Sequence, residues 1–309
     1  MWMEARRCVA ENKKNMRFPA LENGALAARS LFVPDCEHFP LPGADGRNHE
    51  IYVHVPAVEP PPGGFPVLYL LDANADFLLV VETLRRLSRR PRASGIHPVV
   101  VVGIGYPDGP DYDLDRRYED FTRGPPEISD AGWQASTCYG GQAAFIDFVE
   151  NRLKPFIRAT FPVCERRSAL LGHSLAGYLV LDWLCQRPQS FRAFLAVSPS
   201  IWWGREAMLA RLAKPKAAFD GRFRAYLTVG QWEEEPAPWQ SDLSANVSYT
   251  SLRRRRAMIG NVRAFSEHIG EVYGDGVTVR CDIEDGGEHS SSLITCLPRA
   301  LRFAFHDGD

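Results

Sequence analysis

The stretch SALLGHSLAGYLVLDWLC, residues 168–185, decides the fold. A short apolar run typical of a buried strand leads to Gly172, and the run after Ser174 is apolar nearly all round, as in a buried helix. Residues 172–176 (GHSLA) begin the G-x-S-x-G pattern, with Ala176 and then Gly177 where the last glycine would stand. Because small side chains let a strand and a helix approach closely, the pattern predicts a sharp turn that exposes the Ser174 hydroxyl.

Strand-like and helix-like stretches alternate along the rest of the chain. The expected strands are residues 49–56, 66–71, 98–103, 169–171, 193–197, 224–229 and 277–283, and the expected helices are residues 75–87, 143–161, 175–185, 251–269 and 291–305. This alternation is typical of a parallel sheet with crossover helices. Together with the turn at Ser174 it predicts the α/β class and the α/β-hydrolase fold, with a mostly parallel central sheet flanked by helices on both faces.

The 309 residues, 45% of them hydrophobic, suffice for one large core. We expect residues 1–25 to be poorly ordered and residues 26–309 to form a single domain. Within that domain, residues 106–141 and 232–250 are polar and aromatic and fit no regular element, which predicts lid-like insertions. A net charge of −2, a charged N-terminal stretch and the lack of a long apolar run predict a cytoplasmic protein that binds neither nucleic acid nor membrane.

A histidine should act as general base for Ser174. In this fold the catalytic residues follow the order serine, acid, histidine, which excludes the five of the eight histidines that precede Ser174. His268 lies within an expected helix and His306 lies at the chain end. His289 stands in a glycine- and serine-rich loop directly after the last expected strand, so we expect it to reach back to Ser174.

The acid of this triad should lie in the sequence VGQWEEE, residues 229–235, which follows an expected strand. Glu233 is favoured because it comes three residues after the strand-ending glycine, and Glu234 and Asp242 are the alternatives. Its task is to hold His289 in the right tautomer and to stabilise the imidazolium. For the oxyanion we expect the backbone N–H groups of Leu175 and Asn74.

Several motifs occur here in the order of one known family: VLYLLDANADF (67–77), RRYEDFT (116–122), GHSLAG (172–177), SPSIWW (198–203), VGQWEEE (229–235) and GGEHSSS (286–292). From about residue 32 to 305 the chain resembles the esterase D-like esterases, and within them the siderophore esterases that open trilactones. The resemblance implies a serine esterase with nucleophile Ser174, base His289 and acid Glu233. The family usually has Asp-Gly-Asn where residues 72–74 are Asp-Ala-Asn.

The resemblance implies hydrolysis of a small-molecule carboxylic ester, such as a ferric siderophore, through an acyl-enzyme. A generic small-ester carboxylesterase, an acyltransferase of the same fold, and a non-catalytic ligand-binding protein on this scaffold are the alternatives. No H-E-x-x-H motif or His/Cys/Asp cluster is evident, so we expect no metal and no cofactor.

A ferric tris-catecholate trilactone is bulky, aromatic and anionic, so its site needs cations and flat apolar surfaces. Arg116 and Arg117 lie in one long loop, and Trp202 and Trp203 follow the strand 193–197. Four arginines, residues 253–256, begin a helix, and at most two of them can face one pocket. We expect Arg116, Arg117, Trp202, Trp203 and Arg255 to bind substrate, because arginine stacks on catechol rings and pairs with their oxygens.

Overall fold

A computed structural model describes residues 33–107, 111–128, 138–214, 221–240 and 247–306. The sheet, its helices and the site belong to the unit Asp35–Asp309. The expected poor order of residues 1–25 concerns residues outside the described ranges and stays a prediction, as does the single domain from residue 26.

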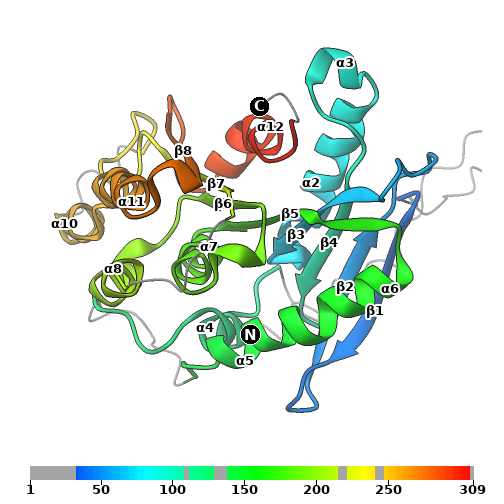
Figure 1. Ribbon diagram of the computed structural model, residues 1–309. Coiled ribbons are helices and arrows are strands. Elements are labelled where there is room, and N and C mark those ends of the chain that lie inside the picture. The colour runs from blue at the N-terminus through cyan, green and yellow to red at the C-terminus, as the bar shows by residue number, and fades with distance from the viewer. Residues whose placement is uncertain (1–32, 108–110, 129–137, 215–220, 241–246, 307–309) are drawn as a thin grey trace, which may run out of the picture. The chain divides into compact units, whose positions relative to one another are not determined.

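The strands in the described part of the chain form one sheet in the order β1-β2-β4-β3-β5-β6-β7-β8 (Figure 1). Neighbours from β4 to β8 run parallel, whereas β2 is antiparallel to both β1 and β4. The strands are β1 (Cys36–Pro42), β2 (Asn48–His54), β3 (Phe65–Leu71), β4 (Val100–Gly105), β5 (Val163–His173), β6 (Ala193–Val197), β7 (Phe223–Gly230) and β8 (Val277–Glu284). The predicted α/β class and mostly parallel sheet are confirmed.

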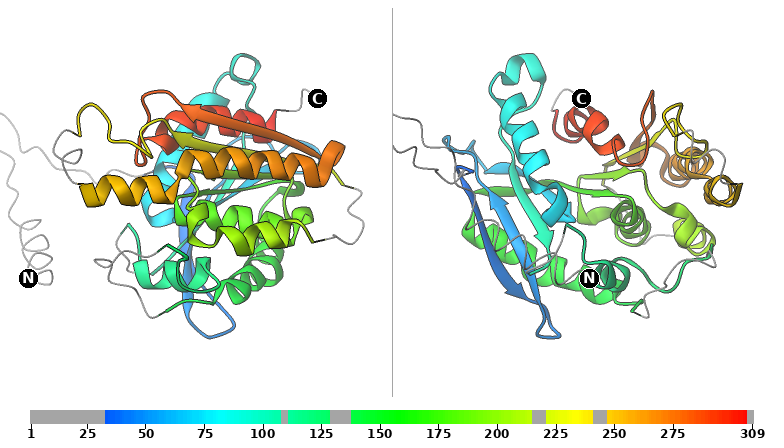
Figure 2. Two further views of the ribbon diagram at one scale, coloured as in Figure 1. Left: turned by 90° about the vertical axis from the view of Figure 1, so that its left-hand side faces the viewer. Right: turned by 180° about the vertical axis from the view of Figure 1, so that it is seen from behind.

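Helices cover both faces of this sheet, as predicted (Figures 1 and 2). On one face α2 (Ala73–Ser88) and α12 (Ser292–Phe305) bury an apolar core that includes Phe77 and Leu297. On the other face α7 (Leu175–Gln186) and α11 (Met258–Tyr273) belong to a second core. The other α-helices in the described ranges are α3 (Pro91–Ser94), α4 (Leu114–Phe121), α5 (Gln142–Phe148), α6 (Lys154–Thr160), α8 (Arg205–Leu212) and α10 (Val247–Arg256).

Two expectations about helices were wrong. Residues 106–141 were expected to lack regular elements, yet their described part contains α4, whose first turn is capped by the Asp113 side chain accepting from the Arg116 N–H. The buried side of α4 includes Arg117 and Asp120, so its sequence lacks the periodic apolar residues that predict a helix. The expected helix 251–269 is two helices, α10 and α11, because Ala257 between them is left-handed with φ 43°.

The sequence patterns also missed the edge strand β1 and the π-helical turn Val149–Leu153 that joins α5 to α6. Strand β1 contains Pro40 and Pro42 and is only partly buried, so it lacks the alternation of apolar residues that marks a half-buried strand. The lid-like role of residues 106–141 and 232–250 stays a prediction, since residues 108–110, 129–137 and 241–246 lie outside the described ranges.

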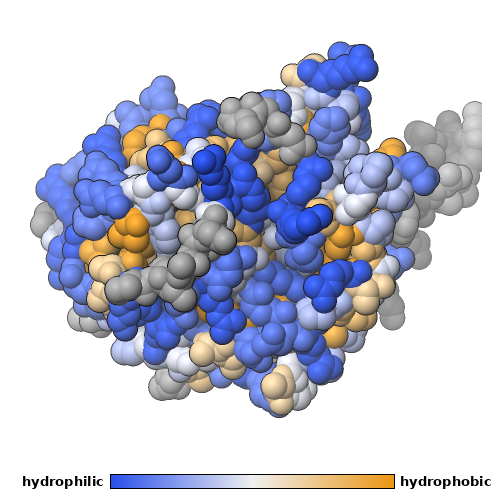
Figure 3. Space-filling view, in the orientation of Figure 1, coloured by the Kyte–Doolittle hydropathy of each residue, from blue (hydrophilic) through white to orange (hydrophobic). Residues whose placement is uncertain are grey.

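No helix among the described residues has the length and apolar character needed to cross a membrane. On the face drawn in Figure 3, hydrophilic residues predominate and hydrophobic ones lie in small separate areas.

Candidate active site

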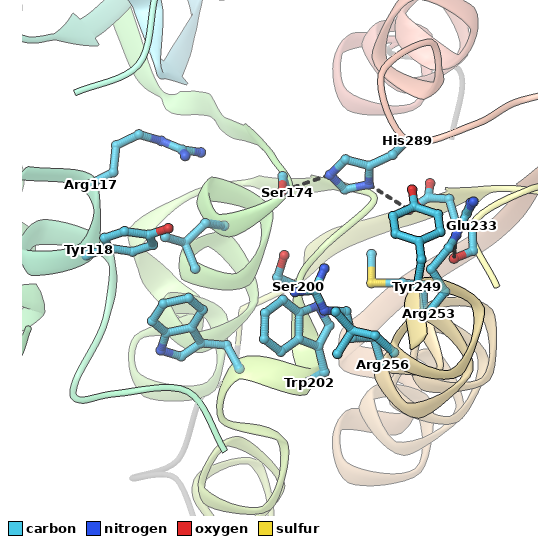
Figure 4. Close-up of a pocket in the computed structure, with 14 residues that line it drawn as sticks. Arg117, Tyr118, Ser174, Ser200, Trp202, Glu233, Tyr249, Arg253, Arg256 and His289 are labelled. Atoms are coloured by element: carbon cyan, nitrogen blue, oxygen red, sulfur yellow. Dashed lines mark hydrogen bonds and ion pairs between the residues drawn. The ribbon is translucent and has the colours of Figure 1, made fainter. Parts of the chain in front are cut away.

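The three candidate catalytic residues meet at the carboxyl ends of the parallel strands. Ser174 follows β5, Glu233 lies in the loop after β7, and His289 lies in the loop after β8 (Figure 4). The carboxyl ends of parallel strands share one edge of a sheet, and this edge is where such folds bind ligands. The strand order β5-β6-β7-β8 therefore brings residues far apart in the sequence to one place.

Ser174 occupies a strained turn. Its backbone has φ 60° and ψ −117°, a conformation that costs a residue with a side chain about 1–3 kcal/mol. The Ser174 N–H donates to the carbonyl of Val197 at 2.9 Å, which ties the turn to β6. A Cβ at Gly172 would lie 2.6 Å from the Ala176 backbone, so only glycine fits where strand and helix cross. This packing is the physical reason for the spacing read in residues 172–176.

A continuous hydrogen-bonded chain joins the three side chains (Figure 4). The distance from His289 Nε2 to Ser174 Oγ is 2.9 Å, and that from His289 Nδ1 to Glu233 Oε2 is 2.8 Å. The carboxylate of Glu233 only accepts, so the proton of the neutral imidazole lies on Nδ1 and Nε2 is free to accept from the serine hydroxyl. This arrangement can deprotonate Ser174.

Glu233 is almost fully buried, with 3% of its surface exposed. Its second oxygen, Oε1, accepts from Ser198 Oγ at 2.5 Å, from the Gly230 N–H at 2.7 Å and from Ser292 Oγ at 3.2 Å. Burial alone would raise the pKa of Glu233, but its bonds with His289, Ser198 and Gly230 outweigh burial and lower it. The carboxylate is therefore ionised and fixed in orientation.

Of the two alternative acids, Glu234 differs from Glu233 in position. Glu234 turns away from His289, and its Oε1 accepts from the N–H groups of Ile259 and Gly260 in the first turn of α11, at 2.7 and 2.9 Å. It therefore stabilises a helix N-terminus, where an anion is favoured. Asp242 lies outside the described residues.

His173, excluded as a base by chain order, holds the loop of His289. Its Nε2–H donates to the backbone carbonyl of His289 at 2.8 Å. Burial, followed by the neighbouring His289, lowers the pKa of His173 to about 4, so the ring is neutral at neutral pH. Sequence reasoning missed this contact and those of Ser198 and Ser292, because each depends on loops that only the folded sheet brings together.

The two expected oxyanion donors, Leu175 and Asn74, have different surroundings. Leu175 lines the cavity next to Ser174, at the start of α7. The Asn74 side chain instead binds the backbone of Tyr106, with Nδ2 donating to its carbonyl at 2.9 Å and Oδ1 accepting from its N–H at 2.8 Å. Any contribution of Asn74 to an oxyanion hole must therefore come from its backbone N–H.

A first cavity of about 270 Å³ adjoins Ser174 and His289. Its walls are aromatic and cationic (Figure 4): Arg117, Tyr118, Trp202, Trp203, Tyr249, Arg253 and Arg256 line it, together with Leu175, Ser200, Leu252, Met258 and Glu233. The Arg256 guanidinium lies 4.2 Å from the centre of the Trp202 ring, and that of Arg253 lies 5.4 Å from the centre of the Tyr249 ring. Such walls suit a flat, electron-rich anion.

Two of the five expected substrate-binding residues do not line this cavity. Arg116 donates from Nη1 to the Asn48 carbonyl at 2.6 Å and lies over the Tyr106 ring, and Arg255 is exposed on α10. Arg253 and Arg256 line the cavity instead. They are three residues apart, and Tyr249 stands four residues before Arg253, so the three share one helix face.

Arg117 lies in the wall of the first cavity and is bound to Asp72. Its Nε and Nη2 donate to the two oxygens of the Asp72 carboxylate at 2.7 and 2.8 Å, and both side chains are buried. Burial lowers the pKa of Arg117, but the Asp72 carboxylate outweighs it, so the net shift is upward and the guanidinium stays charged.

A second cavity of about 320 Å³ meets the same pair, Ser174 and His289. It is lined by Asp76, Leu79, Tyr112, Arg117, His173, Ser290, Leu293 and Ile294. In the described ranges no group of three or more His, Cys, Asp or Glu side chains could hold a metal ion. The absence of a metal and of a cofactor stays a prediction.

The sheet and the turn at Ser174 define the class of α/β-hydrolases. A family model described as "Putative esterase" matches residues 44–280. The ferri-bacillibactin esterase BesA of Bacillus subtilis is 30% identical over 268 residues, which cover 85% of this chain and 86% of BesA. The siderophore triacetylfusarinine C esterase of Aspergillus fumigatus is 32% identical over 288 residues, which cover 89% of this chain and 94% of that esterase. The solved structure of the BES protein of Bacillus cereus superposes with a TM-score of 0.77 at 26% identity, and the match covers 91% of this chain and 99% of the BES chain.

The chain therefore belongs to this esterase family, as the resemblance of its motifs implied. It is an ester hydrolase, related over most of its length to siderophore esterases.

Proposed function

We propose that this protein hydrolyses carboxylic esters with Ser174 as nucleophile, His289 as general base and Glu233 as the acid that orients it. The observation that carries the proposal is the hydrogen-bonded chain from Ser174 through His289 to Glu233. The strained backbone of Ser174 supports it, because such strain is typical of catalytic turns.

The proposed reaction uses each of these groups in turn. His289 Nε2 takes the proton of Ser174 Oγ as this oxygen attacks the ester carbonyl, and the Leu175 and Asn74 N–H groups hold the oxyanion. His289 then gives the proton to the leaving alcohol oxygen, which produces an acyl-enzyme and a free alcohol. In the second half of the reaction His289 deprotonates a water molecule, which attacks the carbonyl carbon of the acyl-enzyme. His289 then returns the proton to Ser174 Oγ, and the carboxylic acid product is released.

We propose a siderophore trilactone as the natural ester. The first cavity places the cations of Arg117, Arg253 and Arg256 and the flat ring of Trp202 beside the nucleophile. A ferric tris-catecholate offers complementary anionic, aromatic arms. The relatives are named for related siderophore esters. A cytoplasmic location stays a prediction from the sequence.

The test is a hydrolysis panel followed by mass spectrometry, with iron-free and ferric trilactones, p-nitrophenyl esters and S-formylglutathione. The proposal expects the trilactones to have the highest kcat/KM and Ser174→Ala to lose several orders of magnitude in kcat. It also expects a fluorophosphonate probe to label Ser174. Near-normal turnover by Ser174→Ala would refute the serine mechanism, and no trilactone hydrolysis by the wild type would refute the substrate.

A further inference from the structure

The two cavities beside Ser174 and His289 differ in the charged side chains that line them. The first contains Arg253 and Arg256. The second contains the carboxyl group of Asp76 and neither of these arginines. Arg117 lines both cavities, but it is already bound to Asp72. A substrate that fills both cavities would therefore meet cations on one side of the scissile bond and an acid on the other.

Asp76 lies in the first turn of α2 and is partly buried in the cavity wall. The nearby guanidinium of Arg117 gives its Nε and Nη2 hydrogens to Asp72, and within the described residues Asp76 has no ion pair of its own. Burial, followed by the charge of Asp72, raises the pKa of Asp76 to about 7, although Arg117 opposes this shift. A partly desolvated carboxylate of this kind is stabilised by a cation brought in by a ligand.

The position of the second cavity indicates which arm of the ester it takes. Ser290, Leu293 and Ile294, which follow His289 in the chain, line it, whereas Leu175 lines the first cavity. The ester carbonyl oxygen has to face the Leu175 N–H in the proposed reaction, and the alcohol oxygen has to receive its proton from His289. The alcohol oxygen thus lies on the His289 side of the scissile bond, and residues that follow His289 line the second cavity.

We propose that the second cavity binds the alcohol arm of the ester and that Asp76 selects an arm with a cationic group, an ammonium or a guanidinium. The inference rests on the proposed esterase function and narrows its substrate class. For a trilactone, it means that a basic amino acid stands next to the scissile ester, while an aromatic anionic arm occupies the first cavity.

Two esters of equal shape test the charge: butyrylcholine, with a cationic alcohol arm, and 3,3-dimethylbutyl butyrate, its neutral counterpart. We expect the wild type to prefer the cationic ester by at least about tenfold in kcat/KM, the size of one partly screened charge pair. Asp76→Asn should lower this ratio about tenfold, because the remaining preference reflects only the better leaving group of the choline ester. The matched control is Glu82→Gln on the same helix, since Glu82 is exposed, pairs with Arg85 and does not line the cavity. It should leave the ratio unchanged.

A ratio that is the same in the wild type and in Asp76→Asn would overturn the proposal. A second pair, the butyl esters of glycine betaine and of 3,3-dimethylbutanoic acid, differs instead in the charge of the acyl arm. If Asp76 discriminates between these two rather than between the choline pair, the assignment of the arm is wrong.

Titration calorimetry of the first two esters into Ser174→Ala, with and without Asp76→Asn, measures the same selection without catalysis. Equal Kd values in Ser174→Ala overturn the role of Asp76. Absence of hydrolysis by the wild type, with charge-selective Kd values intact, would instead count against the esterase mechanism alone.

Discussion

Replacing Glu233 by Gln keeps the shape of the side chain, yet we expect it to abolish most of the activity. Three donors converge on Glu233 Oε1, namely Ser198 Oγ, the Gly230 N–H and Ser292 Oγ. The backbone N–H cannot rotate away, so an amide NH₂ group at this place would face a fixed donor. A glutamine should therefore direct its carbonyl oxygen to Gly230 and its NH₂ group to His289.

This orientation puts the imidazole in the wrong tautomer. An NH₂ group facing His289 Nδ1 requires that nitrogen to accept, so the proton moves to Nε2, 2.9 Å from Ser174 Oγ. An Nε2–H cannot take the serine proton. The expected loss in kcat is about 10³–10⁴-fold, the size seen when a triad imidazole is held in the wrong tautomer. Glu233→Ala imposes no tautomer on His289, so its loss in kcat should be no larger than that of Glu233→Gln, despite the larger change in shape.

The assay is steady-state hydrolysis of p-nitrophenyl acetate, with the ¹⁵N shifts of labelled histidine as a direct measure of the tautomer. Glu234→Gln is the matched control, since Glu234 binds the first turn of α11 rather than His289. It should change kcat less than about threefold while costing about 0.3–1 kcal/mol of stability through the lost charge at the helix N-terminus. Retention of more than a tenth of wild-type kcat by Glu233→Gln, or an Nδ1–H tautomer in its spectrum, would refute the reasoning.

Three further predictions concern the substrate site, pH and the fold. Arg256→Ala should lower kcat/KM for a ferric trilactone about tenfold more than for p-nitrophenyl acetate, whereas Arg255→Ala should not change this ratio; equal effects of both variants would contradict the cavity assignment. Because the pKa of His173 is about 4 in the fold against an ordinary 6.5, the unfolded chain binds this proton first. Its stabilising contribution is thus full above pH 6.5, and up to about 3 kcal/mol is lost as pH falls toward 4. Urea unfolding at several pH values should show that the free energy of unfolding depends less steeply on pH in His173→Gln than in the wild type. An unchanged dependence would exclude His173 as the source of this pH effect. Ala257→Gly should raise the free energy of unfolding by about 0.5–1 kcal/mol, because glycine adopts the left-handed conformation at φ 43° without a Cβ clash; a lower denaturation midpoint would show that the conformation is not strained.

Sequence patterns predict this molecule best where the structure depends on neighbours in the chain. The buried strands, the turn at Ser174 and the loop of His289 each follow from a few consecutive residues. Glu233 could be ranked above Glu234 from its distance to Gly230, and the structure places Glu233 beside His289.

The features that were missed depend on contacts between distant segments. Nothing near Ala257 marks a break, since the two helices are separated by a left-handed alanine rather than by glycine or proline. The choice between Arg255 and Arg256 depends on the direction of α10, which residue counting leaves open. The acidic wall of the second cavity was also missed, because Asp76 reads as an ordinary first-turn carboxylate of a helix.

The precision of the site comes from hydrogen bonds between each strand end and the next strand. The Ser174 N–H binds the Val197 carbonyl at the end of β6, and the Ser198 N–H binds the Thr228 carbonyl in β7 at 2.7 Å. The Trp232 N–H continues the series to the Gly287 carbonyl at 2.8 Å, in the loop that leads to His289. Ser174 and Ser198 both have positive φ, at 60° and 44°, and such strain persists only where surrounding structure fixes it. The parallel sheet thus brings Ser174, Glu233 and His289 together and supplies the rigidity that keeps the strained Ser174 within hydrogen-bond distance of His289.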